Sequence, residues 1–374
     1  MEDKPIKGIL ENYFSKSDKS DWKKMAMLET HGKDPFEILS WRGKDEILFL
    51  PYYDALDVVH LQYLKRFQIP AAKNKNADNR TWVNVSGVNL IDEPTANHLA
   101  LNHLSLGAEG IMFDLRKHHQ TNVNVLMKEI VWPYCSISFY VNAHNTISDT
   151  LSEFIKDHFD PASVHGALIW ESIPKINNLN FYFEHCKNFR ALGLFIPGST
   201  PATEISDALF NGASTFETFI SQNHAEQVFR SISFSLPTDV SFLQSAAKFK
   251  VLRMLWFQVA QAYGQSNYKP ADLHIHARAE AGDDGAYAPH ENMLKGTFSA
   301  IAAVTGGCDS LTIECQSQPP LIPRWAKNVS AILKEESFFN QVADPLAGAY
   351  AYDSLVDSMA KRAWELFQLK WQKT

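Results

Sequence analysis

Two histidines and an arginine occupy alternate positions in one short apolar stretch of the sequence. His274, His276 and Arg278 alternate with leucine, isoleucine and alanine, and Glu280 follows. Because residues two apart on a β-strand point to the same side, the two imidazoles and the guanidinium are expected to share one face. Such a face suits a metal site, a pocket for an anionic ligand, or a hydrogen-bonded polar layer inside the protein. The sequence leaves these three interpretations open.

A second group of polar residues follows another apolar run. Asp114 lies near the end of the run 110–115, and two basic residues and two histidines, among them His118, come directly after it. The carboxyl end of a barrel strand is where barrel enzymes place functional groups, and a charged surface loop is the alternative interpretation. The sequence contains no glycine-rich phosphate loop, no G-x-S-x-G elbow and no H-E-x-x-H motif.

The elements that must position these residues alternate regularly from about residue 80 onward. Short apolar or alternating runs take turns with longer amphipathic segments, which is typical of repeated β-α units. Eight strands each followed by a helix favour a closed (β/α)8 TIM-type barrel, and a doubly wound open sheet is the alternative. The expected strands cover residues 82–86, 110–115, 135–141, 166–170, 192–197, 230–236, 273–277 and 310–315.

Two segments flank the predicted repeats. Residues 1–80 mix polar, helix-like sequence with a turn-rich stretch at 73–79, which predicts an N-terminal extension and linker. Residues 81–374 are then the barrel domain. After Asp344-Pro345, apolar residues three or four positions apart between Leu355 and Phe367 predict a C-terminal helix.

Composition excludes several classes of function. The 374 residues carry 35 Lys and Arg against 42 Asp and Glu, a formal charge of -7, so nucleic acid is not expected as a partner. No apolar run reaches the length of a membrane span and no signal peptide is visible, which favours a cytoplasmic protein without a membrane partner. The 4 cysteines lie far apart without C-x-x-C spacing, so neither a zinc site nor a disulfide framework is predicted.

Four stretches resemble one enzyme family, the adenosylcobalamin-dependent acyl-CoA mutases typified by methylmalonyl-CoA mutase. Residues 344–350 resemble the family motif D-P-x-x-G-S-Y-Y. Residues 242–256 are similar to its F-F-x-E-I-A-K-x-R-A-x-R-x-L-W helix, 291–307 to the helix after the seventh strand, and 110–115 to a G-x-x-x-x-F-D-L strand. The resemblance implies a barrel whose axis is threaded by the pantetheine arm of an acyl-CoA, covered by a cobalamin domain that starts a radical rearrangement.

The chain departs from the family's catalytic motifs. Residues 195–200 read FIPGST where active members carry S-G-Y-H-M, and residues 275–282 keep only the glycine of R-T-H-S-Q-T-S-G. No catalytic residue is therefore assigned. Asp272-x-His274 matches only the first half of the cobalt-ligating motif D-x-H-x-x-G, with alanine at the glycine position, and is treated as chance. The cobalamin-binding domain is expected to be absent, with adenosylcobalamin held by another domain or chain.

The N-terminal part resembles one subtype of the family. Asp34-Pro35-Phe36-Glu37 with Trp41, and then the stretch 48–53, are similar to the start of the small, non-catalytic subunit of heterodimeric bacterial mutases. The resemblance implies a partner of the large catalytic subunit. It would support the isomerisation of methylmalonyl-CoA and succinyl-CoA with little or no turnover of its own.

Two alternatives remain beside the small-subunit hypothesis. One is an active or acyl-CoA-binding mutase barrel whose cobalamin domain is a separate or removed segment. The other is a metal-dependent barrel hydrolase using His274 and His276. For the mutase hypotheses, His276 and Arg278 are the candidate substrate contacts and Asp114 and His118 the candidate cofactor-facing residues, and no metal ligand is assigned. Whether the channel for the pantetheine arm is open cannot be read from the sequence.

Overall fold

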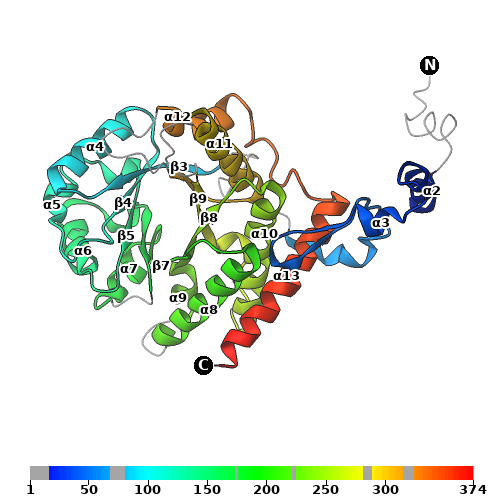
Figure 1. Cartoon of the computed structure of the whole chain (residues 1–374). Coiled ribbons are helices and arrows are strands. Elements are labelled where there is room, and N and C mark those ends of the chain that lie inside the picture. The colour runs from blue at the N-terminus through cyan, green and yellow to red at the C-terminus, as the bar shows by residue number, and fades with distance from the viewer. Residues whose placement is uncertain are drawn as a thin grey trace, which may run out of the picture.

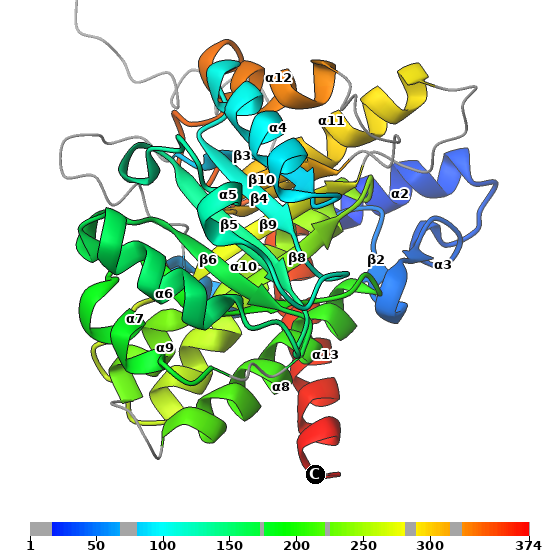
Figure 2. The same cartoon turned by 90° about the vertical axis from the view of Figure 1, so that its left-hand side faces the viewer.

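The core of the structure is a closed barrel of parallel strands. The computed structural model describes residues 17–67, 81–172, 176–220, 225–280, 289–314 and 324–373. Within these residues, eight strands close into a barrel in the order β10-β3-β4-β5-β6-β7-β8-β9 (Figures 1 and 2). The (β/α)8 prediction is confirmed, and the open-sheet alternative is wrong. The strands are β3 (Val83–Asn89), β4 (Gly110–Asp114), β5 (Ser136–Val141), β6 (Gly166–Trp170), β7 (Phe189–Phe195), β8 (Ile232–Thr238), β9 (His274–Glu280) and β10 (Ser310–Glu314).

Several strand boundaries differ from the prediction by two or three residues. β7 begins at Phe189 and not at residue 192, while β9 continues through Arg278 to Glu280. In both strands the missed residues include a charged side chain that faces the inside of the barrel, so the apolar run in the sequence is shorter than the strand. Cys315, predicted to end the last strand, lies outside the described residues.

Helices surround the barrel and cover its apolar outer face. Phe249, Leu252 and Trp256 of α10 are fully buried, because this helix packs against α8, α11 and α13 as well as the barrel. The helices around the barrel are α4 (Glu93–Ser105), α5 (Val123–Leu126), α6 (Ile147–His158), α7 (Leu179–His185), α8 (Pro201–Ile220), α9 (Ala225–Ser231), α10 (Phe242–Ala262), α11 (Pro289–Gly306), α12 (Arg324–Glu335) and α13 (Tyr350–Trp371).

The hydrophobic core has two separate parts. The larger part lies between the outer face of the barrel and the helices. The smaller part fills the middle of the barrel lumen and is made of Val85, Met112, Tyr140, Ala167 and Ile169. Successive residues of each strand therefore contribute alternately to the outer core and to the lumen.

Buried ion pairs fix α10 to its neighbours. Lys248 Nζ lies 2.5 Å from the carboxylate of Glu204 on α8, and both side chains are buried. Lys250 pairs with Asp344 at 2.9 Å, ahead of α13. Residues 242–256, which resemble the family helix, thus lie in α10, a helix that packs against several others.

The N-terminal residues form an arm whose first part, α2 and α3, stands away from the barrel (Figure 1, blue), whereas its second part packs against α8, α10 and α13. The arm contains α2 (Lys19–Glu29), α3 (Pro35–Ile38), the antiparallel pair β1 (Trp41–Arg42) and β2 (Leu48–Phe49), and the short 3-10 helices η1 (Lys44–Glu46) and η2 (Val59–Phe67). The Tyr63 hydroxyl of η2 donates to Asp357 of α13 at 2.7 Å and so attaches the arm to the C-terminal helix. The predicted boundary near residue 80 falls beside residues 68–80, which lie outside the described part.

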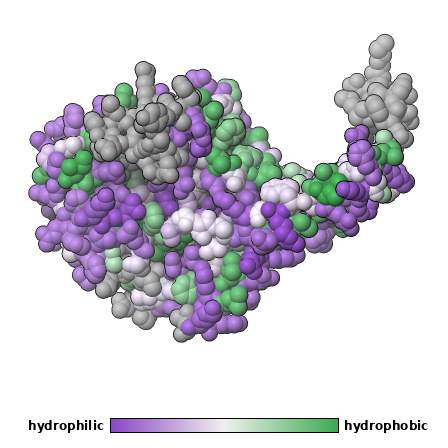
Figure 3. All heavy atoms as spheres, viewed as in Figure 1, coloured by the Kyte–Doolittle hydropathy of each residue, from purple (hydrophilic) through white to green (hydrophobic). Residues whose placement is uncertain are grey.

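The arm exposes apolar side chains. Met25 and Leu28 of α2 are 65% and 72% exposed, and Leu56 is 79% exposed. Hydrophobic patches are visible along the arm in the space-filling view (Figure 3). Over the described residues, we find no helix long and apolar enough to cross a bilayer.

Candidate functional site

His274, His276 and Arg278 lie side by side on the lumen face of β9, as their spacing predicts. His274 Nε2 lies 3.1 Å from the Ser310 hydroxyl, and His276 is fully buried one layer deeper. The structure therefore brings the three predicted residues together inside the barrel. Their proposed roles in ligand contact stay predictions.

His276 is hydrogen-bonded at both ring nitrogens. Nδ1 lies 2.8 Å from the Ser235 hydroxyl and 3.3 Å from the Tyr140 hydroxyl, while Nε2 lies 3.0 Å from the Thr312 hydroxyl. Burial, and then the charge of Arg278, holds the pKa of His276 well below its ordinary value, so the imidazole is neutral. A metal ion at His276 would have to replace one of these hydroxyl contacts. Among the described residues, no cluster of three or more potential metal ligands is found.

Arg278 is held by the wall of the barrel. Its guanidinium donates to the backbone oxygen of Ile196 at 2.6 Å and to that of Ser235 at 3.1 Å. It also stacks on the ring of Phe195, with its central carbon 3.7 Å from the ring centroid, and lies 3.8 Å from the carboxylate of Glu314. These contacts occupy the side chain and fit the interpretation of a hydrogen-bonded polar layer.

A layer of aromatic and cationic side chains fills the lumen at the level of Tyr140. The Tyr140 hydroxyl reaches from β5 to Ser235 on β8, at 3.2 Å, and its ring packs edge-on against Phe195 on β7. Arg116 lies over the same two rings, 4.8 Å from the Phe195 centroid and 5.3 Å from that of Tyr140. We call Tyr140, His276, Phe195, Arg116 and Arg278 the lumen layer. Its members pack against one another across the barrel axis.

Asp114 and His118 lie at the carboxyl-terminal end of the barrel and are both engaged by neighbouring residues. Asp114 ends β4 and binds Arg116 through both carboxylate oxygens, at 2.9 and 2.6 Å. His118 Nε2 lies 2.9 Å from the backbone oxygen of Leu90. The hydrogen bonds to Asp114 are the main cause that raises the pKa of Arg116, which also lies 3.6 Å from Glu171.

The described residues do not fit the corrin cofactor that the sequence resemblance implies. His118 already uses one ring nitrogen on the backbone, and Asp114 is bound by Arg116. Asp272 accepts from the Lys269 backbone amide, and His274 lies at the amino-terminal end of β9. The half-match Asp272-x-His274 therefore lies at the end of the barrel opposite to Asp114. Neither pair of residues offers a prepared ligand for cobalt.

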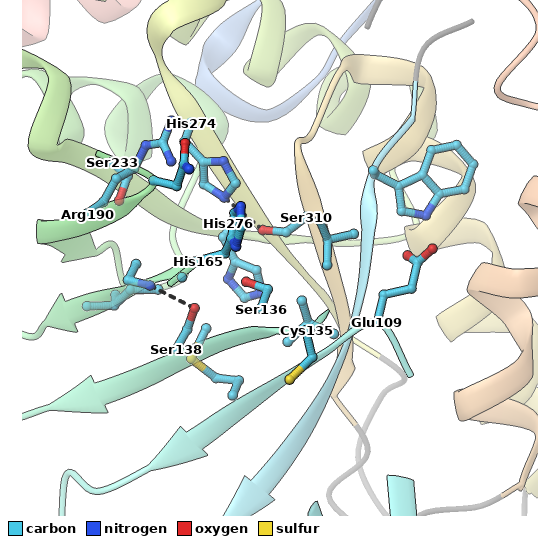
Figure 4. A pocket seen from close by; sticks show the side chains of 18 of the residues that line it. Glu109, Cys135, Ser136, Ser138, His165, Arg190, Ser233, His274, His276 and Ser310 are labelled. Carbon is cyan, nitrogen blue, oxygen red and sulfur yellow. Dashed lines mark hydrogen bonds between the residues drawn. The ribbon is translucent and has the colours of Figure 1, made fainter. Parts of the chain in front are cut away.

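A cavity of about 500 Å³ occupies the amino-terminal half of the lumen (Figure 4). This volume is in the range of small-molecule sites. Its deep end is formed by Met112, by Ile169 and by His276 of the lumen layer, and its outer end by residues that precede the strands, such as Asn188 and His165. Short side chains leave this space open, namely Ser136, Ser138, Ala167, Ser233 and Ser310.

Sequence reasoning missed this end of the barrel. The available signal is the serine at alternate positions in two predicted strands, Ser136 and Ser138 in one and Ser233 and Ser235 in the other. Small polar residues on one face of a strand indicate that the lumen is not filled there. Arg190 also lines the cavity, but it precedes the predicted strand at 192–197 and was not recognised as an inward residue.

Comparisons with known proteins point to one family. A family model described as methylmalonyl-CoA mutase matches residues 184–370, half of the chain. The methylmalonyl-CoA mutase small subunit of Porphyromonas gingivalis is 26% identical over 372 residues, covering 89% of this chain and 59% of that protein. The probable methylmalonyl-CoA mutase small subunit of Mycobacterium bovis is 31% identical over 183 residues, covering 46% and 29%. The chain thus spans about three fifths of the first of these relatives and less of the second.

Among solved structures, a dihydropteroate synthase from Coxiella burnetii in complex with pteroic acid aligns with a TM-score of 0.35 and 11% identity. The alignment covers 62% of this chain and 87% of that one. The assignment of the barrel rests on the strand order and closure described above.

Proposed function

Because this chain belongs to the methylmalonyl-CoA mutase family, we propose that it is a small-subunit-like barrel that pairs with a catalytic large subunit. In this role it supports adenosylcobalamin-dependent isomerisation of methylmalonyl-CoA and succinyl-CoA. It has little or no turnover alone, and the cofactor is held by the partner. The proposed pairing is supported by the names of the two relatives described above, because each is called a small subunit.

The main structural support for low turnover by this chain is the lumen layer. In an active mutase barrel, the acyl end of the substrate must travel along the barrel axis to a cofactor at the carboxyl-terminal end. Here Tyr140, Phe195 and Arg278 occupy that path and contact one another across it. Phe195, His276 and Arg278 of this layer come from the stretches 195–200 and 275–282, in which the sequence departs from the family's catalytic motifs. A substrate arm entering from the amino-terminal end would stop at His276.

The apolar surface of the arm supports pairing with another chain. Met25, Leu28 and Leu56 are largely exposed although they are large and apolar. Exposed apolar residues grouped on one projecting element are typical of protein interfaces. The arm therefore offers a surface for the proposed partner.

Reconstitution with the large subunit of the same organism tests the proposal. The large subunit, this chain and their mixture are each assayed with adenosylcobalamin and methylmalonyl-CoA, and the mixture is examined for a stoichiometric complex. We expect a complex and higher or more durable activity in the mixture, and none from this chain alone. Turnover by this chain with only a separate cobalamin-domain protein would instead establish the active-barrel alternative.

The cavity favours a second candidate function, the binding of an acyl-CoA without turnover. Its volume and hydroxyl-lined wall suit a slim polar chain such as a pantetheine arm. A ligand that binds only the folded protein raises its unfolding temperature. Thermal unfolding with and without methylmalonyl-CoA tests this candidate, and an unchanged transition at millimolar ligand would contradict it.

A further inference from the structure

The tip of the arm contacts the barrel at two neighbouring loops. The tip is η1, the turn between β1 and β2, which packs on α8 and lies beside α10 in Figure 1. Asp45 accepts a hydrogen bond from the backbone amide of Ala202 at 2.8 Å and another from the Thr200 hydroxyl. Lys44 forms an ion pair with Asp239. The tip therefore binds both the β7–α8 loop (196–200) and the β8–α10 loop (239–241), at the carboxyl-terminal end of the barrel.

Asp45 caps a helix from a distant part of the chain. Ala202 is the second residue of α8, and its amide is one of those at the start of a helix that have no partner within the helix. A carboxylate at this position satisfies the amide and is favoured by the helix dipole. Because 157 positions separate Asp45 from Ala202 in the sequence, α8 loses this cap whenever the tip moves away.

The backbone of the tip is strained where it makes these contacts. Asp45 and the adjacent Glu46 have φ angles of 62° and 59°, in the left-handed region that residues other than glycine rarely adopt. Gly43 precedes them at a close approach, since a Cβ there would come within 2.9 Å of Gln244 Nε2 on α10. A strained backbone of this kind persists only while its surroundings hold it. The two loops therefore hold the tip, and a tip that leaves the barrel relaxes.

Both loops also contact Arg278 of the lumen layer. Ile196 begins the first loop, and its backbone oxygen accepts from the Arg278 guanidinium at 2.6 Å, while its amide donates to the Ser235 backbone oxygen at 2.9 Å. Thr238 directly precedes the second loop, and its hydroxyl donates to the Arg278 backbone oxygen at 3.2 Å. The contacts with the tip and the contacts with Arg278 are thus only a few residues apart on the same two segments.

We propose that the tip of the arm is a latch on the lumen layer. Docked, it holds the two loops and keeps Arg278 and Phe195 in place across the barrel axis, and undocked, it releases them. The coupling is reciprocal, so a molecule that binds the arm away from the barrel would loosen the lumen layer. The latch goes beyond the proposed pairing and does not depend on it, because both of its states belong to this chain alone.

Hydrogen exchange of the full chain, followed by NMR at single amides, tests the latch. The informative amides are those of Ala202, which binds Asp45, and of Ile196, which lies beside the lumen layer. Asp45→Ala removes the carboxylate, and we expect both amides to exchange roughly 2- to 30-fold faster, the range that corresponds to loss of a helix cap. Faster exchange of Ala202 alone would show a purely local cap and overturn the latch. Unchanged exchange of both amides would overturn it as well.

Two further variants separate the latch from a general loss of stability. Asp45→Asn keeps a side-chain oxygen and tolerates the left-handed backbone, so it should restore most of the protection. Asp92→Ala is the matched control, because Asp92 caps α4 from its own N-cap position and accepts from the Thr95 amide at 2.8 Å. This control should speed exchange at the start of α4 and leave Ile196 unchanged. Faster exchange of Ile196 in the control would indicate general loosening and contradict the latch.

The side chain of Arg278 gives a second readout. Its guanidinium carbon lies 3.7 Å from the ring centroid of Phe195, so the NMR signal of its Nε–H group is shifted by the aromatic ring. We expect this shift to decrease in Asp45→Ala and to be unchanged in Asp92→Ala. An unchanged shift in Asp45→Ala would show that Arg278 stays in place without the tip and would refute the latch. These measurements need no large subunit, so their failure would leave the proposed pairing untouched.

Discussion

Tyr140 and His276 are 136 positions apart in the sequence and meet across the lumen. Their contact depends on barrel closure, and among the described residues neither side chain has a hydrogen bond to a carboxylate. Tyr140, with a pKa that burial raises above its ordinary value, stays protonated, and His276 stays neutral. The lumen layer is therefore a polar network whose protonation is set by burial.

The protonation of His276 makes the stability of the fold depend on pH. Its folded-state pKa is depressed, so the unfolded chain takes up a proton that the folded chain resists. The stability that follows from this is complete above about pH 6.5, the ordinary value for histidine, and is lost as the pH falls below it. We expect His276→Gln to flatten the decline of unfolding free energy between pH 7 and pH 5, where one such group contributes at most about 1.4 kcal/mol per pH unit.

Urea unfolding at a series of pH values measures this slope. His185→Gln is a suitable control, because His185 is exposed on α7. The same slope in the His276 variant and the unsubstituted chain would contradict a neutral, buried His276. Arg278 and His274 lie on the same strand, and their charges also lower the pKa of His276, so both residues are kept unchanged in the two chains compared.

Part of the candidate site could be predicted from local sequence. The alternation at 274–278 places three side chains on one face of a strand, and the structure agrees. Their partners could not be predicted, because Ser235, Thr312 and Tyr140 come from three other strands whose alignment depends on the stagger of the closed barrel. The sequence therefore indicated which residues point inward but not which of them touch.

At the scale of elements, the strands were predicted best where the apolar run equals the strand. Residues 166–170 coincide with β6, whereas β7 was predicted to begin after Arg190. A single inward arginine interrupts an apolar run without ending a strand, since the lumen face tolerates polar residues. The arm could be predicted only as an extension, because its polar and apolar residues show no long period.

The buried pair of Lys248 and Glu204 is expected to be essential for joining α10 to α8. Lys248→Met leaves the carboxylate of Glu204 buried without its cation and should lower the unfolding free energy by about 3–5 kcal/mol. Adding Glu204→Gln to this variant should recover part of that loss. Chemical denaturation gives both values.

Lys361→Met provides the matched control for this pair. Lys361 is 67% exposed, and its partner Asp357 keeps the hydrogen bond from the Tyr63 hydroxyl when Lys361 is replaced, so the loss of Lys361 should cost less than about 1 kcal/mol. An effect of Lys248→Met as small as that of Lys361→Met would refute the structural role of the buried pair.

Helix α2 of the arm is expected to contribute to pairing without supporting the barrel. Met25→Asp with Leu28→Asp places two charges on the exposed apolar surface of α2, which has no buried residue. We expect at least about tenfold weaker binding of the large subunit, since each apolar side chain buried at an interface contributes roughly 1.5–3 kcal/mol, and an unchanged unfolding temperature.

Binding of the large subunit is measured by surface-immobilised titration. Leu369→Asp on α13 is the control, because Leu369 is also apolar and 53% exposed. If the α2 variant binds the large subunit as tightly as the unsubstituted chain does, the interface lies on another surface of the chain.

At the scale of the whole molecule, the barrel is closed by the pairing of its first strand, β3, with its last strand, β10. β3 and β10 share two paired positions in the described residues, whereas β8 and β9 share six. Side chains reinforce the joint, since Trp82 Nε1 donates to Ser330 at 2.8 Å and Lys334 donates to the Trp82 backbone oxygen at 2.7 Å. Among the described residues, this joint has the fewest paired positions of the eight strand interfaces of the barrel.

Hydrogen exchange should therefore detect the joint as the place where the barrel opens first. Local opening requires less free energy where fewer backbone pairs must separate. We expect amides of β3 to exchange faster than those of β8 under native conditions, and Ser330→Ala to increase the difference. Equal protection of the two strands would show that the barrel opens only as a whole.

The same joint sets a delay during biosynthesis. β3 is translated early, but its partner β10 appears only after six further strands, which takes about 10–45 s at the usual ~5–20 residues per second. Throughout this interval the nascent sheet has two unpaired edges, and such edges can pair with those of other chains. Slow elongation or a shortage of chaperones should therefore reduce the yield of this protein by aggregation before closure, even when the finished barrel is stable.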